Sequence, residues 1–356
     1  MLNQKLSHLS INERMNYIKE NMFNLITDED NVLQAYYNTQ KGKPRLKKSA
    51  MAARRRYTRV LTKIVKDIKN GTYVHNGYII FTVKEPKIRL VYAPTYVDKV
   101  VQHMINNILR EYYEPKFIYD SYACIRERGN KAATKRLQYQ LRQASKEYRN
   151  PYYLKLDISK FFYTINRDTL KKILRKEIKC EKTLCLLDII IDSFVEPLGL
   201  PLGNLTSQLF ANIYLNEIDK FIKDKLNIKY YLRYADDMFF ILEDYNEAFR
   251  IRDLIIKTVF DNLKLIINPK KVIVKPAQNI AGLGFIIKKT HIDILRKNRI
   301  GFRALLKKEN INSLNSWYGY AGIAKCKIFV YRELIKYGKN RVNYRIKFRN
   351  NKFTVE

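Results

Sequence analysis

The chain has 356 residues, of which 46% are hydrophobic and 13% aromatic, so it can form a packed interior and is not a disordered chain. Its 68 Lys and Arg residues outnumber 34 Asp and Glu residues, which gives a formal net charge of +34. A protein this cationic binds polyanions through phosphate contacts and counterion release, so nucleic acid is the expected partner.

The same composition excludes several protein classes. The first 20 residues lack the apolar stretch of a signal peptide, and no run approaches the ~18 apolar residues of a membrane span. No segment has the pattern of a basic amphipathic membrane anchor. The four cysteines form no Cys-x-x-Cys pair, which argues against a zinc site or a disulfide framework and predicts reduced, mostly buried thiols. We therefore expect a cytoplasmic protein.

Hydrophobic periodicity predicts helices around one hairpin in the first 150 residues. Two apolar runs, YIIFTV and KIRLVYA, flank Glu85-Pro86 and are typical of a hairpin. The predicted helices cover residues 45–70, ended by Gly71, then residues 95–113 and 130–148. The first and third of these helices are strongly basic.

The rest of the chain alternates between strands and helices. The predicted strands are 152–157, the two apolar runs that surround Asp236-Asp237, 272–276 and 282–287. The predicted helices are 167–178, 183–195, about 205–226 after the turn LGLPLGN, 246–262, and a basic helical region from about 298. A polar tail is predicted after Lys339. Composition shifts near residues 150 and 290 mark the expected subdomain boundaries.

Three carboxylates stand where strands end. Asp157 closes a short apolar strand, and Asp236-Asp237 lie at the tip of a predicted hairpin 79 residues later (236 − 157 = 79). Neighbouring strand ends of one sheet can hold two Mg²⁺ ions about 3.5–4 Å apart, the arrangement that phosphoryl transfer to a growing strand requires. Taken singly, each acid is more typical of a turn former or a helix N-cap than of a metal ligand.

The flanking residues decide between these readings. YLRYADDMFFIL resembles the Tyr-x-Asp-Asp box of reverse transcriptases, and LKLDISKFFYTI resembles their first aspartate motif. GLPLGNLTSQLFANIYLNEID resembles the Gly-containing motif between the two. LKLIINPKKV and AGLGFII resemble the downstream motifs, and PKIRLVYAPTYVDKVVQHMI and SYACIRERGNKAA resemble the fingers motifs. The resemblance covers about residues 40–330, in the order of the family.

The resemblance implies an RNA-directed DNA polymerase with an α+β, right-hand polymerase fold. Such a fold has fingers made of helices and a hairpin, a palm with an antiparallel sheet and packed helices, and a helical thumb. The expected domains are an N-terminal helical extension (1–40), fingers with part of the palm (41–150), the palm with the catalytic Asp residues and the primer grip (151–290), and a basic helical thumb and tail (291–356).

The resemblance also assigns roles to single residues. Asp157, Asp236 and Asp237, with the backbone carbonyl of Ile158, would bind two Mg²⁺ ions, or Mn²⁺ in their place. Lys271 matches the lysine that protonates the leaving pyrophosphate, and Lys270 is the rival for that position.

The remaining assignments concern substrates. Lys87 and Arg89 would bind the triphosphate of the incoming dNTP, next to Leu202 and Gly203 of the Gly-containing motif. Phe162 matches the steric gate that rejects ribonucleotides. Gly284 matches the turn of the primer grip, where the lack of a side chain lets the backbone approach the primer. Arg126 and Arg128 are expected to contact the template.

One motif departs from the common family pattern. Most reverse transcriptases have Gln before the Gly and Ser-Pro at the end of the motif, where this chain has Leu202-Gly203 and Ser207-Gln208. That form resembles the enzymes of diversity-generating retroelements, which copy a template RNA with errors at adenines and use the cDNA in mutagenic retrohoming. The resemblance implies template RNA, the RNA–DNA duplex, dNTPs and a small basic accessory protein as partners, and no membrane.

Four alternatives remain open at this point. The chain could be a retron-type or a group II intron-type reverse transcriptase of ordinary fidelity, or a defence-type polymerase that makes DNA without a template. It could also be an RNA-binding scaffold without activity, although three acids that repel one another without metal argue against this.

Overall fold

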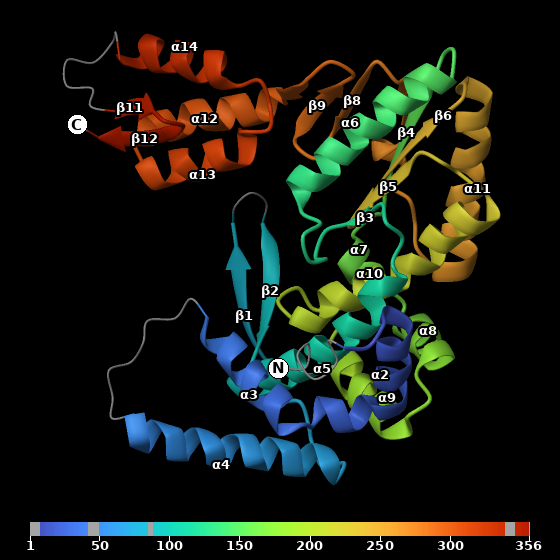
Figure 1. The fold of residues 1–356 in the computed structure, drawn as a ribbon, viewed down its shortest axis with the longest axis vertical. Coiled ribbons are helices and arrows are strands. Elements are labelled where there is room, and N and C mark those ends of the chain that lie inside the picture. The colour runs from blue at the N-terminus through green and yellow to red at the C-terminus, as the bar shows by residue number, and fades with distance from the viewer. Residues whose placement is uncertain (1–7, 42–49, 85–87, 339–345, 356) are drawn as a thin grey trace. The chain divides into compact units, whose positions relative to one another are not determined.

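Figure 1 shows the fold in a computed structural model that describes residues 8–41, 50–84, 88–338 and 346–355. The chain forms two compact units, each assembled from three segments. Unit 1 contains Met1–Tyr119, Ile158–Leu226 and Ile256–Ile267, and unit 2 contains Asp120–Asp157, Asn227–Ile255 and Asn268–Glu356. The chain therefore passes from one unit to the other five times.

Unit 1 is mostly helical, with one antiparallel hairpin. Its elements are α2 (Ile11–Ile26), α3 (Glu29–Gln40), α4 (Ala50–Lys69), β1 (Tyr78–Val83), β2 (Arg89–Pro94), α5 (Tyr96–Tyr113), η1 (Glu114–Lys116), α7 (Phe161–Thr164), α8 (Arg167–Glu177), α9 (Glu181–Asp192), α10 (Leu205–Lys220) and η2 (Phe221–Lys225). Helix α11 (Tyr245–Leu263) belongs to unit 1 with its C-terminal part and to unit 2 with its N-terminal part.

Helix α5 is the centre of unit 1. It packs against α2, α3 and α10, and its apolar side chains from Val100 to Leu109 are completely buried. The hydroxyl of Thr95 caps its first turn by accepting from the N–H of Asp98. The buried side chains of α5 thus form the packed support of the helices around it and of β2.

The end of α4 illustrates how local sequence sets an element boundary. Gly71 has φ +69, a left-handed conformation that glycine adopts without steric cost. The N–H groups of Gly71 and Thr72 donate to the carbonyls of Ile68 and Asp67, which is the Schellman pattern of helix termination. The predicted end of this helix is therefore confirmed.

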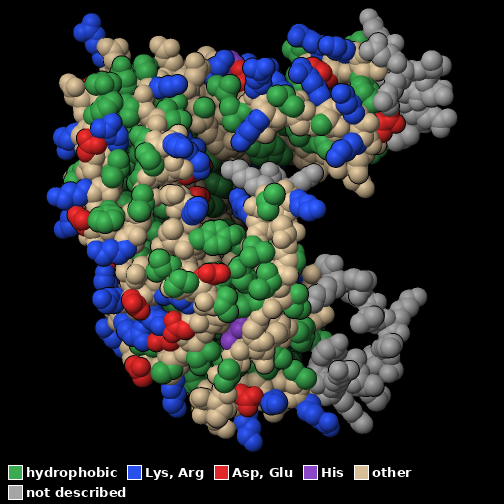
Figure 2. Space-filling model, turned by 180° about the vertical axis from the view of Figure 1, so that it is seen from behind, with side chains coloured by type: hydrophobic (Ala, Val, Ile, Leu, Met, Phe, Trp, Pro, Cys, Tyr) green, Lys and Arg blue, Asp and Glu red, His purple; other side chains and the backbone are tan. Residues whose placement is uncertain are grey.

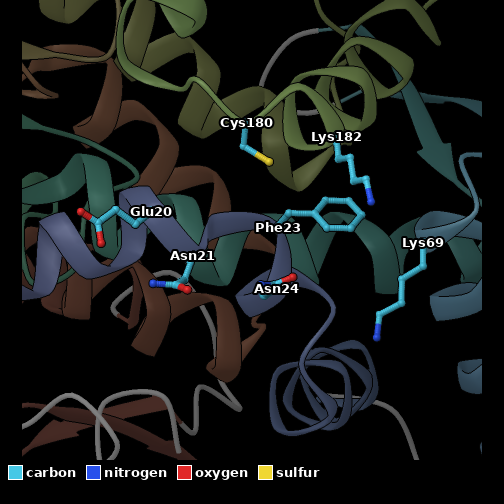
Figure 3. A pocket seen from close by; sticks show the side chains of 7 residues that line it. All are labelled: Glu20, Asn21, Phe23, Asn24, Lys69, Cys180 and Lys182. Carbon is cyan, nitrogen blue, oxygen red and sulfur yellow. The ribbon is translucent and has the colours of Figure 1, made fainter.

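Helices α2, α4 and α9 also border a pocket in unit 1 (Figure 3). The side chains of Lys69 and Lys182 flank the ring of Phe23 there. The pocket is lined by Glu20, Asn21, Phe23, Asn24, Lys69, Cys180 and Lys182. None of the residues that the sequence assigned to a functional site lines this pocket.

Unit 2 is built on a five-stranded sheet with the strand order β3-β5-β6-β4-β7. All neighbouring strands are antiparallel except β3 and β5, which are parallel. The strands are β3 (Ser121–Tyr122), β4 (Tyr152–Asp157), β5 (Tyr231–Tyr234), β6 (Asp237–Leu242) and β7 (Ile273–Pro276). Helix α6 (Asn130–Glu147) packs against this sheet through Leu137 and Leu141.

The rest of unit 2 follows the sheet in the chain. It contains η3 (Pro269–Lys271), the three-stranded sheet of β8 (Asn279–Gly282), β9 (Phe285–Lys288) and β10 (Ile292–Ile294), the helices α12 (Arg296–Lys308), α13 (Ile311–Ala321) and α14 (Lys327–Gly338), and the hairpin of β11 (Ile346–Arg349) and β12 (Lys352–Val355). One hydrophobic core joins the two sheets, α6, the three helices and the hairpin.

Most predicted elements are confirmed, among them the strand 152–157, the hairpin around Glu85-Pro86 and the strands on both sides of Asp236-Asp237. Glu85, Pro86 and Lys87 themselves lie outside the described residues. The predicted strand 282–287 is wrong as a single strand, because Leu283 and Gly284 form the turn between β8 and β9.

The polar tail predicted after Lys339 is wrong for residues 346–355, the part of it that the structure describes. Ile346, Phe348 and Phe353 of the β11–β12 hairpin are buried, and Phe348 and Phe353 contact the ring of Tyr318 in α13. Asn350 and Asn351 both have positive φ, as the tight turns of two-residue hairpins require. Alternating apolar residues therefore reach the core although their neighbours are basic.

The prediction of mostly buried cysteines needs a correction. The four cysteines form no disulfide, as predicted, but only Cys326 is buried, whereas Cys124 and Cys185 are exposed. Cys124 lies in the loop after β3, and Cys185 lies on the outer face of α9, four residues after Glu181. Within the described ranges, no helix is both long and apolar enough to cross a membrane.

Candidate active site

Three carboxylates meet at one end of the central strands of unit 2. Asp157 is the last residue of β4 and lies directly opposite Asp237, the first residue of β6. Asp236 precedes it in the β5–β6 turn. Asp157 is buried, and the other two are half-buried. The structure thus brings together the three acids that the sequence singled out.

The local sequence explains why these acids lie where they do. In β4, Leu154 and Leu156 are completely buried, and successive side chains of a strand point to opposite faces. Lys155 and Asp157 therefore share the other face of the sheet. The β5–β6 turn depends on Ala235, whose φ of +52 reverses the chain just before Asp236.

Two lysines neutralise the strand-end acids. The ammonium of Lys271 donates to both carboxylate oxygens of Asp157, each at 2.7 Å. The ammonium of Lys155 lies 2.8 Å from Oδ1 of Asp237, as an ion pair without hydrogen-bond geometry. The two pairs bring four charged groups to one end of the sheet.

The segment that carries Lys271 is attached to the backbone of Asp157. The N–H of Asn268 donates to the carbonyl of Asp157 at 2.8 Å, and β7 then pairs with β4. The side chain of Asn268 caps η3 by accepting from the N–H of Lys270, and Pro269 follows at the first position of the turn. The sequence NPKK therefore places Lys271, and not Lys270, on the carboxylate.

The electrostatics of the cluster follow from this arrangement. Burial raises the pKa of Asp236, and the neighbouring charges of Asp237 and Asp157 raise it further. The hydrogen bond to Asp157 raises the pKa of Lys271, which keeps its ammonium protonated. Three neighbouring acids disfavour one another's ionised forms and therefore need cations nearby. Here two lysines supply part of the compensating positive charge.

The donor set of this cluster suits a hard divalent ion, because Mg²⁺ and Mn²⁺ prefer carboxylate oxygens. Within the described ranges, no three Asp, Glu, His or Cys side chains gather closely enough to hold an ion as they stand. The oxygens of Asp157 face Lys271, and Oδ1 of Asp237 faces Lys155. Binding an ion would require these carboxylates to exchange an ammonium contact for the metal.

The predicted nucleotide-binding residues meet in unit 1, around the loop Gly199–Asn204. The carbonyl of Leu202 accepts from the N–H of Tyr92 in β2 at 2.7 Å, and the N–H of Leu200 donates to the carbonyl of Phe162 at 2.7 Å. Backbone hydrogen bonds therefore join the hairpin strand that carries Arg89, the loop and the segment that carries Phe162.

Gly203 is required at this junction for two reasons. Its φ is +122, and a Cβ there would lie 2.5 Å from the carbonyl oxygen of Tyr92. Any side chain would push β2 away from the loop. The glycine of the motif thus sets the distance between the loop and the hairpin strand.

The base of that hairpin is anchored by one buried carboxylate. Asp98 is completely buried and accepts from the hydroxyl of Tyr73 at 2.7 Å, the hydroxyl of Thr95 at 2.6 Å and two N–H groups of Asn76. Arg89 follows at the far end of β2, with an exposed side chain, opposite Val83. Lys87 lies outside the described residues.

The two aromatic residues after Asp157 differ in burial. Phe161 is 4% exposed and belongs to the core, whereas the ring of Phe162 is only partly buried. Ile158 is almost completely buried and forms an isolated bridge with Ile267. Of the two rings, that of Phe162 is therefore the one that a ligand can contact.

Gly284 lies in a turn, as expected, and the fold gives a reason of its own for a glycine there. Leu283 and Gly284 have φ +55 and +89, and a Cβ on Gly284 would collide with the hydroxyl of Tyr320. The carbonyl of Leu283 accepts from Tyr320 Oη at 2.9 Å and from Asn130 Nδ2 at 3.0 Å, and the carbonyl of Gly284 accepts from Asn298 Nδ2 at 2.8 Å. The tight fit to α13 already requires glycine there.

Arg126 and Arg128 lie in the loop between β3 and α6. Arg126 is exposed, and Arg128 is half-buried. The N–H of Ala123 donates to the carbonyl of Arg128 at 3.1 Å, which closes the loop. Ala123, Cys124 and Glu127 have positive φ, so the loop is a tight turn.

Two residues near the acids were not predicted from sequence. Lys155 could have been found from the strand alternation, since it stands two residues before Asp157 and must share its face. Arg233 is a completely buried cation in β5, three residues before Asp236. A charged residue inside an apolar strand is the signal that could have found it.

Comparison with known proteins places the cluster in a family context. Residues 82–287, more than half of the chain, match the family described as reverse transcriptase (RNA-dependent DNA polymerase). The chain is 30% identical over 174 residues to the group II intron-encoded protein LtrA of Lactococcus lactis subsp. cremoris, a match that covers 46% of this chain and 28% of that protein. This chain thus spans little more than a quarter of the length of that relative.

Two further proteins are similar over longer stretches. The chain is 25% identical over 270 residues to the retron Ec73 reverse transcriptase of Escherichia coli, which covers 67% of this chain and 79% of that protein. The solved structure of apo telomerase from Candida tropicalis, truncated from the C-terminal domain, superposes with a TM-score of 0.49 at 13% identity, covering 61% of this chain and 55% of that one.

Proposed function

The chain belongs to the reverse transcriptase (RNA-dependent DNA polymerase) family, and from this premise we propose that it extends a DNA strand by copying a template RNA. The observation that carries the proposal is the position of Asp157 opposite Asp237, with Asp236 beside it and Lys271 on Asp157. The family also carries the right-hand polymerase fold, so the predicted α+β class is confirmed. The division into four predicted domains remains a proposal.

Asp157, Asp236 and Asp237 would hold the divalent ions that the family generally uses, with the Ile158 carbonyl as a further oxygen donor. Two Mg²⁺ ions, when bound, would neutralise the triphosphate and lower the pKa of the primer hydroxyl. The acids come from two adjacent strand ends, so their backbone positions are fixed before any ion binds. Lys155 would keep Asp237 neutralised until then.

Lys271 would act as the general acid. It stays protonated, because its hydrogen bond to Asp157 raises its pKa, and its side chain is about half exposed. Once the carboxylate of Asp157 turns to a cation, the ammonium is free to donate to the leaving pyrophosphate. The hydrogen bond to Asp157 thus keeps Lys271 beside the acids and protonated until it donates its proton.

The loop Gly199–Asn204 would form the base of the nucleotide site. Arg89 would bind the triphosphate, Phe162 would exclude a ribose 2′-hydroxyl, and Leu202 and Gly203 would face the nucleotide. The backbone bonds from Tyr92 to Leu202 and from Leu200 to Phe162 support the assignment, because they hold these three elements in one constellation. Gly284 would line the primer grip, and Arg126 and Arg128 would contact the template.

We further propose that copying is error-prone at template adenines, as in diversity-generating retroelements. The side chain of Leu202 is half-buried and has no hydrogen-bonding group, while its carbonyl is already used by Tyr92. A site that holds a nucleotide without directional bonds penalises misaligned bases less. A retron-type or group II intron-type enzyme of ordinary fidelity is the alternative, and both kinds occur among the similar proteins.

The proposed partners are template RNA, the growing RNA–DNA duplex, dNTPs and a small basic accessory protein. The space-filling view shows Lys and Arg side chains over much of the visible surface and fewer acidic ones, in keeping with a polyanionic partner (Figure 2). Two cationic proteins would meet through the RNA or through the few acidic patches.

Sequencing of cDNA made with Mg²⁺, dNTPs and a primed RNA that contains all four bases tests both levels of the proposal. Errors concentrated opposite template adenines are expected, and Leu202→Gln should reduce them. A uniformly low error rate in the unmodified protein would be consistent with an RNA-directed DNA polymerase but would contradict the assignment to diversity-generating retroelements. Asp236→Asn should abolish synthesis and keep RNA affinity, and unchanged synthesis would overturn the role of the three acids.

A further inference from the structure

Among the described residues of unit 2, Arg233 in β5 is the largest completely buried side chain, with 0% of its surface exposed. A guanidinium stays charged at every relevant pH, and burying it is unfavourable unless its N–H groups find acceptors. The arginine stands three residues before Asp236. An apolar residue of the same size could fill this position, so the presence of a charge there needs an explanation.

The guanidinium joins two strands of the sheet. Nη2 donates to the hydroxyl of Ser121 in β3 at 2.8 Å, and Nη1 donates to the carbonyl of Ala235 at 3.1 Å. Ser121 is also completely buried and is the register partner of Arg233 in the parallel β3–β5 pair. The planar fork of an arginine can reach two such acceptors at once, whereas a lysine ammonium is a single point.

The contact to Ala235 bears on the catalytic turn. Ala235 has φ +52, a conformation that non-glycine residues rarely adopt. Both of its backbone groups are held, since its N–H donates to the carbonyl of Tyr122 at 3.3 Å and its C=O accepts from Arg233. A peptide group is planar, so fixing the carbonyl of Ala235 also fixes the nitrogen of Asp236.

We propose that Arg233 is a positioning residue that holds the turn of Asp236 and Asp237 in its reactive conformation. Through Ser121 it ties that turn to β3, and β3 leads directly into the loop of Arg126 and Arg128. The buried cation thus links the segment proposed to contact the template with the segment proposed to bind metal. The inference rests on the proposed function for the role of the acids.

A purely structural role would make a different prediction. If Arg233 only filled the core, its loss would lower stability, and the remaining folded molecules would work normally. If it positions the turn, the folded molecules themselves should have a lower kcat. The decisive readout is therefore kcat per folded molecule, together with the mobility of the turn.

The experiment compares Arg233→Lys, Arg233→Met and Ser121→Ala with the unchanged protein on a short primed RNA. Displacement of catalytic groups by about 1 Å costs roughly 10²-fold in rate, so Arg233→Met should lose kcat on that order. KM for dNTP and the affinity for RNA should stay close to the original values. Arg233→Lys should retain part of kcat, and Ser121→Ala should lose less than Arg233→Met, because the bond to Ala235 remains.

Hydrogen exchange of residues 234–238 gives a readout that does not depend on activity. These amides should exchange faster in Arg233→Met while the amides of β4 keep their protection. Ala235→Gly serves as the variant that folds without difficulty, since glycine adopts positive φ at no steric cost. It should loosen the same turn and lower kcat without lowering the thermal midpoint.

The outcomes separate the inference from the proposed function. Full kcat in both Arg233 variants, or unchanged exchange at the turn, would overturn the positioning role. Absence of cDNA synthesis by the unmodified protein would count against the proposed function instead, and the exchange measurement would still decide whether Arg233 holds the turn.

Discussion

Lys270 and Lys271 are adjacent residues of the same charge with different surroundings. Lys271 is bonded to both oxygens of Asp157, whereas the backbone N–H of Lys270 donates to the side chain of Asn268 and its own side chain is exposed. If Lys271 is the general acid, Lys271→Ala should lower kcat by about 10²–10⁴-fold. Lys270→Ala removes the same charge and should change kcat by no more than about two-fold.

Single-turnover incorporation of one dNTP measures this difference without interference from product release. Equal losses in the two variants would mean that the lysines act only through their charge, and the assignment of the acid to Lys271 would then fall.

Phe162 has a neighbour that serves as its control. Phe162 is half-buried beside the Gly199–Asn204 loop, while Tyr163 is 37% exposed and Phe161 belongs to the core. Phe162→Ala should therefore admit ribonucleotides, because the ring that would collide with the 2′-hydroxyl is gone. Tyr163→Ala should keep the selection for dNTPs. Incorporation of ATP against dATP on one primed RNA decides the matter, and strict exclusion in Phe162→Ala would place the gate elsewhere.

At this scale the sequence predicted the residues that belong to contiguous motifs. Asp157, Asp236, Asp237 and Lys271 each sit in a recognisable string, and the structure brings all four together. Arg233 could not be assigned a role in this way, because its function depends on Ser121, which is 112 residues away in the chain. Long-range partners of this kind leave no local pattern.

At the scale of elements, the β11–β12 hairpin shows how a basic segment can still be part of the core. The ring of Phe353 is 2% exposed and contacts Phe302 of α12, while the next side chain, Thr354, points outward. Phe353→Ala should destabilise unit 2 by about 3–5 kcal/mol, the usual cost of removing a buried aromatic ring. Thr354→Ala is the matched control and should change stability by no more than about 0.5 kcal/mol.

Denaturant unfolding followed by tryptophan fluorescence measures this effect in the right place. Trp317 is the only tryptophan of the chain, and its ring packs on Phe302. A Phe353→Ala midpoint equal to that of the control would show that the hairpin does not support α12 and α13.

The elements that were predicted correctly have strong local signals, and those that were missed do not. The strand of Asp157 was found because four apolar residues precede a single acid. Strand β3 has two residues and exists through its parallel pairing with β5, so no window of sequence contains its cause. In β11 and β12 the apolar residues alternate with charged ones, so the two strands were not predicted, although Asn350-Asn351 is typical of a two-residue hairpin turn.

For the whole molecule, charge is the dominant property. With a formal net charge of +34, RNA binding should depend steeply on salt. If 6–10 phosphates are contacted, the affinity should fall by about 10³–10⁵-fold between roughly 50 and 200 mM salt. Fluorescence anisotropy with a labelled RNA at constant Mg²⁺ measures the slope. Asp236→Asn should share the slope of the unchanged protein, and a flat response would contradict electrostatic binding.

The five passages of the chain between the two units also have a consequence for biosynthesis. Unit 1 needs its last segment, Ile256–Ile267, whose Leu263 carbonyl accepts from the hydroxyl of Tyr214. Neither unit can therefore close on the ribosome from an uninterrupted N-terminal piece. Unit 1 becomes complete once residue 267 has left the exit tunnel, whereas unit 2 must wait for Phe353. The acids at 157, 236 and 237 are thus all synthesised well before the core that supports them. During this long interval the nascent chain must avoid premature collapse.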